Sequence, residues 1–431
     1  MTRRVYLHVG APKSGTTYLQ RVLRHNQAAL ARQGVLVAGR THADLVHAGF
    51  VIREDPRLQG LPERAARSWD RIVDEIRAFP GDVAVVSYEL LAGARRRQAR
   101  RAIDNLAGLE VHVIVTTRDL GRAVSSAWQE RLKFALTEPL ESWRPRPASD
   151  SVRAEWGWRT MDPGSVASRW GATLPPEQVH IVTAPRGGGM PTALWDRFAE
   201  ACSLEDVRLD LNVPMANESL GVAAAEVLRR VNEHDLGPIT GAREQARWLR
   251  DRLAHAVLAD LDAEPMSITD EQLADAQTRA QEAVSTIRTS GWQVHGDLDD
   301  VQATRRAGRL PSEVPAEELL DVSTRAIVQL LLELRAQETA SRERSSGAGV
   351  MRSASGWRSR VVDFGGSRSG AKLDALIDKA DALERRVQDS RRLHERVASL
   401  ADLVEELLLP PGQEDRRSLK KALRRYRGRS L

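Results

Sequence analysis

The chain has 431 residues, of which 42% are hydrophobic and 29% charged, with a formal net charge of +5. This length allows a large core and two or three structural units. A single cysteine, Cys202, excludes disulfides within the chain and a cysteine-based metal cluster. The sequence contains no run of 18 apolar residues, so no membrane-spanning helix is predicted. The first apolar run is too short for a signal peptide. We expect a cytoplasmic protein. The first 340 residues lack a basic domain with interleaved aromatics, so no nucleic-acid partner is expected.

Apolar patterning predicts short buried strands that alternate with helices. We expect strands at 5–10, 35–37, 83–87, 111–116 and 179–183, and helices at 16–32, 62–78, 94–106, 162–170, 191–201, 242–261, 270–290 and 316–337. Residues 40–62 and 139–161 lack periodicity and are predicted as loops. Ser219 is a predicted N-cap for a helix to Val231. The alternation favours an α/β fold with a central parallel sheet covered by helices on both faces, and ligands bind at the carboxyl ends of such strands.

The first predicted strand runs into a glycine-rich turn, because residues 10–17 read GAPKSGTT and a helix follows. Backbone N–H groups and the positive end of the helix dipole meet at such a turn and form an anion site. Lys13, Ser14, Gly15, Thr16 and Thr17 are therefore the candidate phosphate-binding residues. The alternative is an ordinary strand–helix turn that binds no phosphate.

The position of the lysine separates this turn from common nucleotide-binding loops. The Walker pattern places Lys directly after its second glycine, whereas Lys13 lies two residues before Gly15. Lysine occurs at six positions in a chain that otherwise uses arginine, which favours a specific need for an ammonium group at position 13. The PKSGTT segment resembles the 5′-phosphosulfate loop of the sulfotransferases that use 3′-phosphoadenosine 5′-phosphosulfate (PAPS). That family has a P-loop-like, three-layer fold.

A second candidate site lies at the end of the fourth strand, where residues 113–128 read VIVTTRDLGRAVSSAW. In the sulfotransferase family, an arginine at this strand end and a serine eight residues later hold the 3′-phosphate of PAPS. Arg118 and Ser126 match that spacing, and Ser125 matches it less well. Taken alone, Arg118 is more simply read as a solvated side chain or as the partner of Asp119.

The resemblance implies transfer of a sulfuryl group from PAPS to an acceptor hydroxyl, without a metal ion. Lys13 would then stabilise charge on the leaving phosphate. A general base should take the acceptor proton, and the candidates are Glu89, His47, His42 and His8. We prefer Glu89 because it directly follows a strand end. The acceptor is expected to be a carbohydrate, a glycolipid or a small metabolite.

Tryptophans gather in the aperiodic stretch 139–161, at positions 143, 156 and 158. Tryptophan rings stack on sugars, but they also fill gaps in cores. We favour packing over acceptor binding for these three side chains.

Composition divides the chain into five parts. Residues 1–215 form the predicted PAPS-binding core, and 216–340 a helical part of the same domain. Residues 341–371, rich in Ser, Gly and Arg, are a predicted flexible linker. Residues 372–409 have the apolar spacing of a coiled coil, for self-association or for packing on the catalytic domain. Residues 410–431 include eight Lys or Arg, which would contact an anionic membrane or form a solubilising tail.

Two alternatives to a sulfotransferase stay open. One is a P-loop nucleotide kinase or NTPase, against which the position of Lys13 argues. The other is a non-catalytic coiled-coil scaffold with a vestigial nucleotide site, against which the intact turn argues.

Overall fold

The structure is a computed structural model that describes residues 2–147, 156–186, 191–213 and 219–354. The chain divides into two compact units, Met1–Ala340 and Ser341–Leu431. The predicted coiled coil at 372–409 and the basic tail at 410–431 lie outside the described residues. The strands and the helices before α14 belong to the first unit, and α14 (Ala316–Ala354) extends past its last residue.

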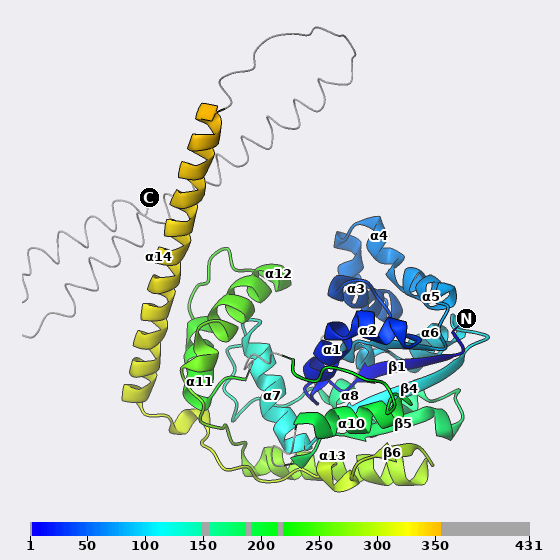
Figure 1. Ribbon diagram of the computed structural model, residues 1–431. Helices are drawn as coiled ribbons and strands as arrows, with labels where there is room; N and C mark the ends of the chain where they lie inside the picture. The colour runs from blue at the N-terminus through cyan, green and yellow to red at the C-terminus, as the bar shows by residue number, and fades with distance from the viewer. Residues whose placement is uncertain (1, 148–155, 187–190, 214–218, 355–431) are drawn as a thin grey trace, which may run out of the picture. The chain divides into compact units, whose positions relative to one another are not determined.

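A six-stranded parallel sheet runs through this unit in the order β2-β3-β1-β4-β5-β6 (Figure 1). The strands are β1 (Arg4–Gly10), β2 (Val35–Val37), β3 (Val83–Ser87), β4 (Glu110–Thr117), β5 (Val179–Thr183) and β6 (Gln293–His295). The five predicted strands and the parallel α/β class are confirmed. β6 was not predicted, because three residues with an exposed pattern carry no strand periodicity.

Helices cover both faces of the sheet. The helices are α1 (Thr16–His25), α2 (Gln27–Arg32), α3 (His42–Arg53), α4 (Glu63–Ala66), α5 (Ser68–Ala78), α6 (Arg96–Asp104), α7 (Leu120–Leu132), α8 (Trp158–Met161), α9 (Pro163–Trp170), α10 (Pro191–Ala201), α11 (Val222–Asn232), α12 (Gly241–Gln245), α13 (Asp270–Thr289) and α14 (Ala316–Ala354). Leu7 of β1 packs in a core with α3, α5, α6 and α9, whereas the neighbouring Tyr6 packs with α1 and α10. Side chains alternate across a strand, so the sheet is the middle of three layers.

Strand register places three strand ends together. β1 lies between β3 and β4, with His8 opposite Ser87 on one side and Gly10 opposite Val115 on the other. The segments that leave β1, β3 and β4 therefore meet at one edge of the sheet. This is the edge at which parallel α/β sheets bind ligands.

The prediction of a loop at 40–62 was wrong, because α3 fills much of it. Thr41 accepts a hydrogen bond from the Asp44 backbone N–H at 3.2 Å, and Asp44 accepts one from the Thr41 N–H at 3.0 Å. This capping box fixes the start of α3. The buried face of the helix includes Ala48 and Gly49, and a Cβ on Gly49 would lie 2.5 Å from the Tyr88 ring. Small buried residues of this kind give a weak apolar pattern.

Several predicted helices have different limits. The helix at 16–32 is divided at Asn26, and the one at 62–78 is divided at Arg67. Residues 242–261 form α12, a π-helix at Ala246–His255 and a short 3₁₀ helix. The 316–337 helix continues as α14 to Ala354, into the range predicted as linker. Within the described residues, no helix has the length and hydropathy needed to cross a membrane.

Ser219 is not an N-cap. The residue before α11 is Gly221, and the carboxylate of Asp262 accepts hydrogen bonds from the backbone N–H groups of Ala223 and Ala224 at 2.8 and 3.3 Å. A distant carboxylate therefore replaces the predicted local cap at this helix end.

The tryptophans pack as expected. Trp143 and Trp158 are buried in the core beside α7 and α13, and Trp156 packs against the same core. Residues 148–155, within the same predicted loop, lie outside the described part of the chain.

Three histidines form a hydrogen-bonded row across β4, β5 and β6. His112 Nδ1 lies 2.8 Å from His180 Nε2, and His180 Nδ1 lies 3.0 Å from His295 Nε2. The carboxylates of Glu110 and Glu200 lie at the two ends, 2.8 and 3.4 Å from the terminal ring nitrogens. Burial, together with the neighbouring His112, His295 and Arg4, lowers the pKa of His180 to about 3.

We predict that acid destabilises the fold through these buried histidines. Burial also lowers the pKa of His8 to about 3, whereas an unfolded histidine titrates near pH 6.5. The folded-state pKa is the lower one, so this stability is complete above pH 6.5 and is lost as the pH falls toward 3. Between pH 7 and 5, the free energy of unfolding should fall with a limiting slope of about 1.4 kcal/mol per pH unit per histidine.

Denaturant unfolding at several pH values measures this slope. His180→Asn should make it shallower, whereas His234→Gln, at an exposed position, should leave it unchanged. A wild-type stability that stays constant from pH 7 to 5 would contradict the prediction.

Candidate functional site

The backbone between β1 and α1 forms a tight loop that needs glycine at both ends. Gly10 and Gly15 have φ of 138° and 90°, and a Cβ at these positions would lie 2.7 Å from the Glu89 carbonyl oxygen and 2.3 Å from Leu194 Cδ2. Lys13 also has a positive φ, of 65°. The loop is thus held between the segment after β3 and α10, with its free N–H groups at the start of α1.

A chain of buried polar side chains supports the loop from below. Ser14 Oγ lies 2.6 Å from the Ala11 carbonyl oxygen and 2.5 Å from Thr116 Oγ1. His8, which is fully buried, lies between Thr116 Oγ1 and Ser87 Oγ, at 3.1 and 2.7 Å from its two ring nitrogens. These bonds occupy the Ser14 hydroxyl and both nitrogens of His8 inside the protein. Ser14 therefore offers its backbone to a ligand, and His8 positions the loop.

The ammonium group of Lys13 binds a carboxylate that sequence reasoning missed. Lys13 Nζ lies 2.9 Å from Glu130 Oε1 on α7, and the fully buried Lys133 donates to the same oxygen at 2.8 Å. Although burial raises the pKa of Glu130, the two lysines lower it to about 2. Two of the six lysines of the chain therefore share one ionised carboxylate beside the loop.

Arg118 connects the end of β4 to the loop. Its Nη1 donates a 2.8 Å hydrogen bond to the Lys13 carbonyl oxygen. Burial and the neighbouring Arg122 lower the pKa of Arg118 to about 10, which leaves the guanidinium charged at neutral pH. Asp119 caps α7 by accepting from the Arg122 N–H at 3.0 Å, and it also accepts from Thr304 Oγ1 at 2.5 Å. The segment after residue 303 is thereby held against the same strand end.

Arginines line a cavity of about 410 Å³ at this junction, which we call the arginine cavity. Its walls come from the β4–α7 turn and from segments 184–186 and 304–306, and its charged residues are Arg118, Asp119, Arg122, Arg186, Arg305 and Arg306. Arg122 Nε is buried without a hydrogen-bond partner, and burial together with Arg306 lowers the pKa of Arg122. Several cations that repel one another around a cavity favour a bound anion.

Sequence reasoning found Arg118 but not Arg122, Arg305 or Arg306. Arg122 lies in the first turn of α7, close behind Arg118 in the sequence, and this was a usable signal, whereas no local pattern marks Arg305 and Arg306 as neighbours of β4. Ser126 is half-buried on α7 and is not among the residues that line the arginine cavity.

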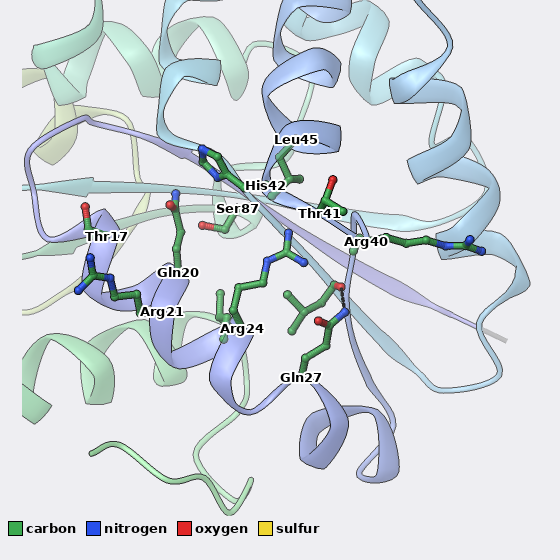
Figure 2. A pocket seen from close by; sticks show the side chains of 13 residues that line it. Thr17, Gln20, Arg21, Arg24, Gln27, Arg40, Thr41, His42, Leu45 and Ser87 are labelled. Atoms are coloured by element: carbon green, nitrogen blue, oxygen red, sulfur yellow. Dashed lines mark hydrogen bonds between the residues drawn. The ribbon is translucent and has the colours of Figure 1, made fainter. Parts of the chain in front are cut away.

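A second cavity, of about 450 Å³, lies along α1, and we call it the α1 cavity (Figure 2). Thr17 of the loop contributes to its wall, together with Gln20 and Arg24 of α1, His42 of α3 and Ser87 at the end of β3. It therefore begins where the β1–α1 loop becomes a helix.

The candidates for the general base differ in whether they lie at the α1 cavity. Gln20 Nε2 donates to Glu89 Oε2 at 2.7 Å, which holds the Glu89 carboxylate next to a residue of the cavity wall. His42 lines the cavity itself. His47 packs beside Phe50, with ring centroids 6.4 Å apart, and is not among the lining residues. Glu89 and His42 are thus placed beside the loop and cavity, whereas His47 is not.

The described residues contain no group of His, Cys, Asp and Glu side chains that could hold a metal ion. The functional groups at this edge of the sheet are cations, hydroxyl groups, amides and the carboxylates of Glu89, Asp119 and Glu130.

Comparisons with known proteins give two kinds of match. A family described as "Domain of unknown function (DUF6752)" matches residues 376–430, the range of the predicted coiled coil and basic tail. No curated protein matches the chain. Among solved structures, a sulfotransferase from Alicyclobacillus acidocaldarius is similar at 16% identity and a TM-score of 0.33, over 50% of this chain and 87% of that one. The sulfotransferase domain from the curacin biosynthetic pathway is similar at 13% identity and a TM-score of 0.28, over 68% of this chain and 99% of that one.

Proposed function

We propose that this chain is a sulfotransferase that transfers a sulfuryl group from PAPS to an acceptor hydroxyl. The observation that carries the proposal is the pairing of two anion-binding sites at one sheet edge. The loop Lys13–Thr17 offers backbone N–H groups and an ammonium, the arginine cavity offers guanidinium groups, and Arg118 belongs to both. PAPS has a phosphosulfate at its 5′ position and a phosphate at its 3′ position, and this charge distribution matches the two sites.

In this proposal the loop binds the 5′-phosphosulfate and the arginine cavity binds the 3′-phosphate. The acceptor oxygen forms a bond to sulfur while the bond from sulfur to the phosphate oxygen breaks, and the hydroxyl proton passes to Glu89. Lys13 and the N–H groups at the start of α1 stabilise the negative charge on the leaving phosphate. The protein contributes mainly positioning and charge stabilisation, as in phosphoryl transfer.

A P-loop kinase or NTPase is the second candidate. It would need an anion site for the β- and γ-phosphates of ATP, and the loop alone could supply one. It would have no use for the arginine cavity, because ATP has no 3′-phosphate. The cavity therefore favours the 3′-phosphorylated nucleotide.

We predict that adenosine 3′,5′-bisphosphate binds more tightly than adenosine 5′-phosphate or ATP, as measured by calorimetry. Arg122→Ala and Arg306→Ala should each weaken the bisphosphate about 10- to 100-fold, because each removes a charged hydrogen-bond donor. Neither variant should change the affinity for adenosine 5′-phosphate. Arg325→Ala, which removes an exposed arginine of α14, is the matched control.

The proposed function fails if ATP binds tightly and the bisphosphate does not. A bisphosphate affinity that survives both arginine substitutions would instead remove the arginine cavity from cofactor binding.

We also predict that Glu89→Gln lowers kcat about 10²- to 10⁴-fold, the usual contribution of a general base. The amide is isosteric and can still accept the hydrogen bond from Gln20, so the affinity for adenosine 3′,5′-bisphosphate should stay unchanged. His47→Gln tests a second base candidate and should leave kcat nearly unchanged. The reverse pattern, with kcat lost in His47→Gln alone, would exclude Glu89 as the base.

A further inference from the structure

The α1 cavity lies where an acceptor would have to bind under the proposed function. Thr17 belongs both to the phosphate-binding loop and to the cavity wall. Gln20 lines the cavity and holds Glu89 through its side-chain amide. A molecule in this cavity would therefore be next to both the loop and the proposed base. The volume of about 450 Å³ is in the range of small-molecule sites.

Arg24 places a cation inside this cavity. Figure 2 shows its guanidinium pointing between Thr41, His42 and Ser87, whereas the exposed Arg40 points away. Arg24 Nη1 donates to the Gly39 carbonyl oxygen at 2.5 Å, but its Nη2 is buried without a hydrogen-bond partner. A buried guanidinium nitrogen without a partner is costly, and a ligand anion would remove that cost.

The nearest carboxylates do not take this role. Asp44 and Glu75 act on Arg24 through their charge, which opposes the lowering of its pKa by burial. However, Asp44 bonds to Thr41 and Arg71 at 2.9 and 3.0 Å, and Glu75 accepts from the Gly39 N–H at 2.9 Å. Neither carboxylate hydrogen-bonds to Arg24, so its Nη2 is left without a partner.

Apart from Arg21 and Arg40, which also line the cavity, the rest of the wall offers hydrogen-bonding groups and apolar side chains. Amides and hydroxyl groups come from Thr17, Gln20, Gln27, Thr41 and Ser87. His42 supplies the one aromatic ring among the lining residues, and the apolar contribution comes from small and aliphatic side chains such as Ala38 and Leu45. This lining suits a ligand with many hydroxyl groups better than a flat aromatic one or a lipid chain.

We propose that the α1 cavity binds the acceptor, and that this acceptor is a polyhydroxylated acid whose anionic group pairs with Arg24. The anion is a carboxylate, as in a uronic acid, or a sulfate ester on a sugar. This inference rests on the proposed function, because only a transferase has an acceptor. Binding in the cavity can nevertheless be measured without any transfer reaction.

Calorimetric titrations of the full chain, saturated with adenosine 3′,5′-bisphosphate, test the proposal with three probes. These are glucuronate, glucose 6-sulfate and glucose. At least one of the two anions should bind about 10- to 100-fold more tightly than glucose, the effect of a charged hydrogen bond. The tighter of the two identifies the anionic group. Equal binding of all three would overturn the proposal.

Substitution of Arg24 locates the effect. Arg24→Gln should abolish the preference for the anion while the affinity for glucose stays the same. Arg32→Gln, on the exposed face of α2, is the matched control and should keep the preference. Thermal unfolding checks that both variants fold, and if Arg24→Gln does not, Arg24→Lys should keep the cation and weaken the preference. An anion preference that persists in Arg24→Gln also overturns the proposal.

The measurements distinguish a failure of the acceptor proposal from a failure of the sulfotransferase proposal. If the bisphosphate does not bind but glucuronate still binds through Arg24, the sulfotransferase assignment fails and the anion site stands. If the bisphosphate binds through Arg122 and the three sugars bind equally, the acceptor class is wrong and the proposed function stands.

Discussion

The hydrogen bond from Arg118 to the Lys13 carbonyl oxygen, 2.8 Å long, is the contact on which the site depends. It joins the end of β4 to a loop that follows β1, more than one hundred residues earlier in the chain. The contact exists because β1 pairs with β4 from Arg4 to Gly10, with one register shift after His8, which brings the two strand ends together. Because the Arg118 guanidinium holds the loop by one nitrogen and also lines the arginine cavity, it fixes the spacing between the loop and that cavity.

This arrangement requires buried polar side chains that support the loop, and the strands of the sheet supply them with hydrogen-bond partners. On neighbouring strands β1, β3 and β4, His8 bonds to Ser87 and Thr116, and Thr116 also bonds to Ser14. Each is buried, so an unsatisfied group would be expensive, but the strand register places a partner beside every one. Burial lowers the pKa of His8, so its ring stays neutral between the two hydroxyl groups. The same burial that supports the loop makes the fold sensitive to acid.

Local signals in the sequence were sufficient for the parts of the site that lie within one segment. The loop at Lys13, the strand end at Arg118 and five strands follow from glycine positions and apolar runs of a few residues. The rest depends on contacts between distant segments. Glu130 meets Lys13 only after α7 packs beside the loop, and Arg306 reaches the arginine cavity because Asp119 bonds to Thr304. β6 is recognisable only from its pairing with β5. The buried face of α3 includes small residues, so its apolar pattern is weak in the sequence. The five-part division of the chain stays a prediction.

The shared carboxylate explains how Lys13 can serve two partners under the proposed function. Glu130 Oε1 accepts from Lys13 and from Lys133, and Lys133 is completely buried while Lys13 is partly exposed. Removing a lone cation from a buried carboxylate would be costly, because the charge would be left without a counterion. Here Lys133 stays in place, so Lys13 can turn toward a bound anion while Glu130 keeps one ammonium partner. A flexible ammonium group suits this change of partner better than a planar guanidinium does. The fixed donors of a guanidinium would form a bidentate pair with the carboxylate. The lysine at position 13, in a chain that uses arginine almost everywhere else, then follows from the need to exchange partners.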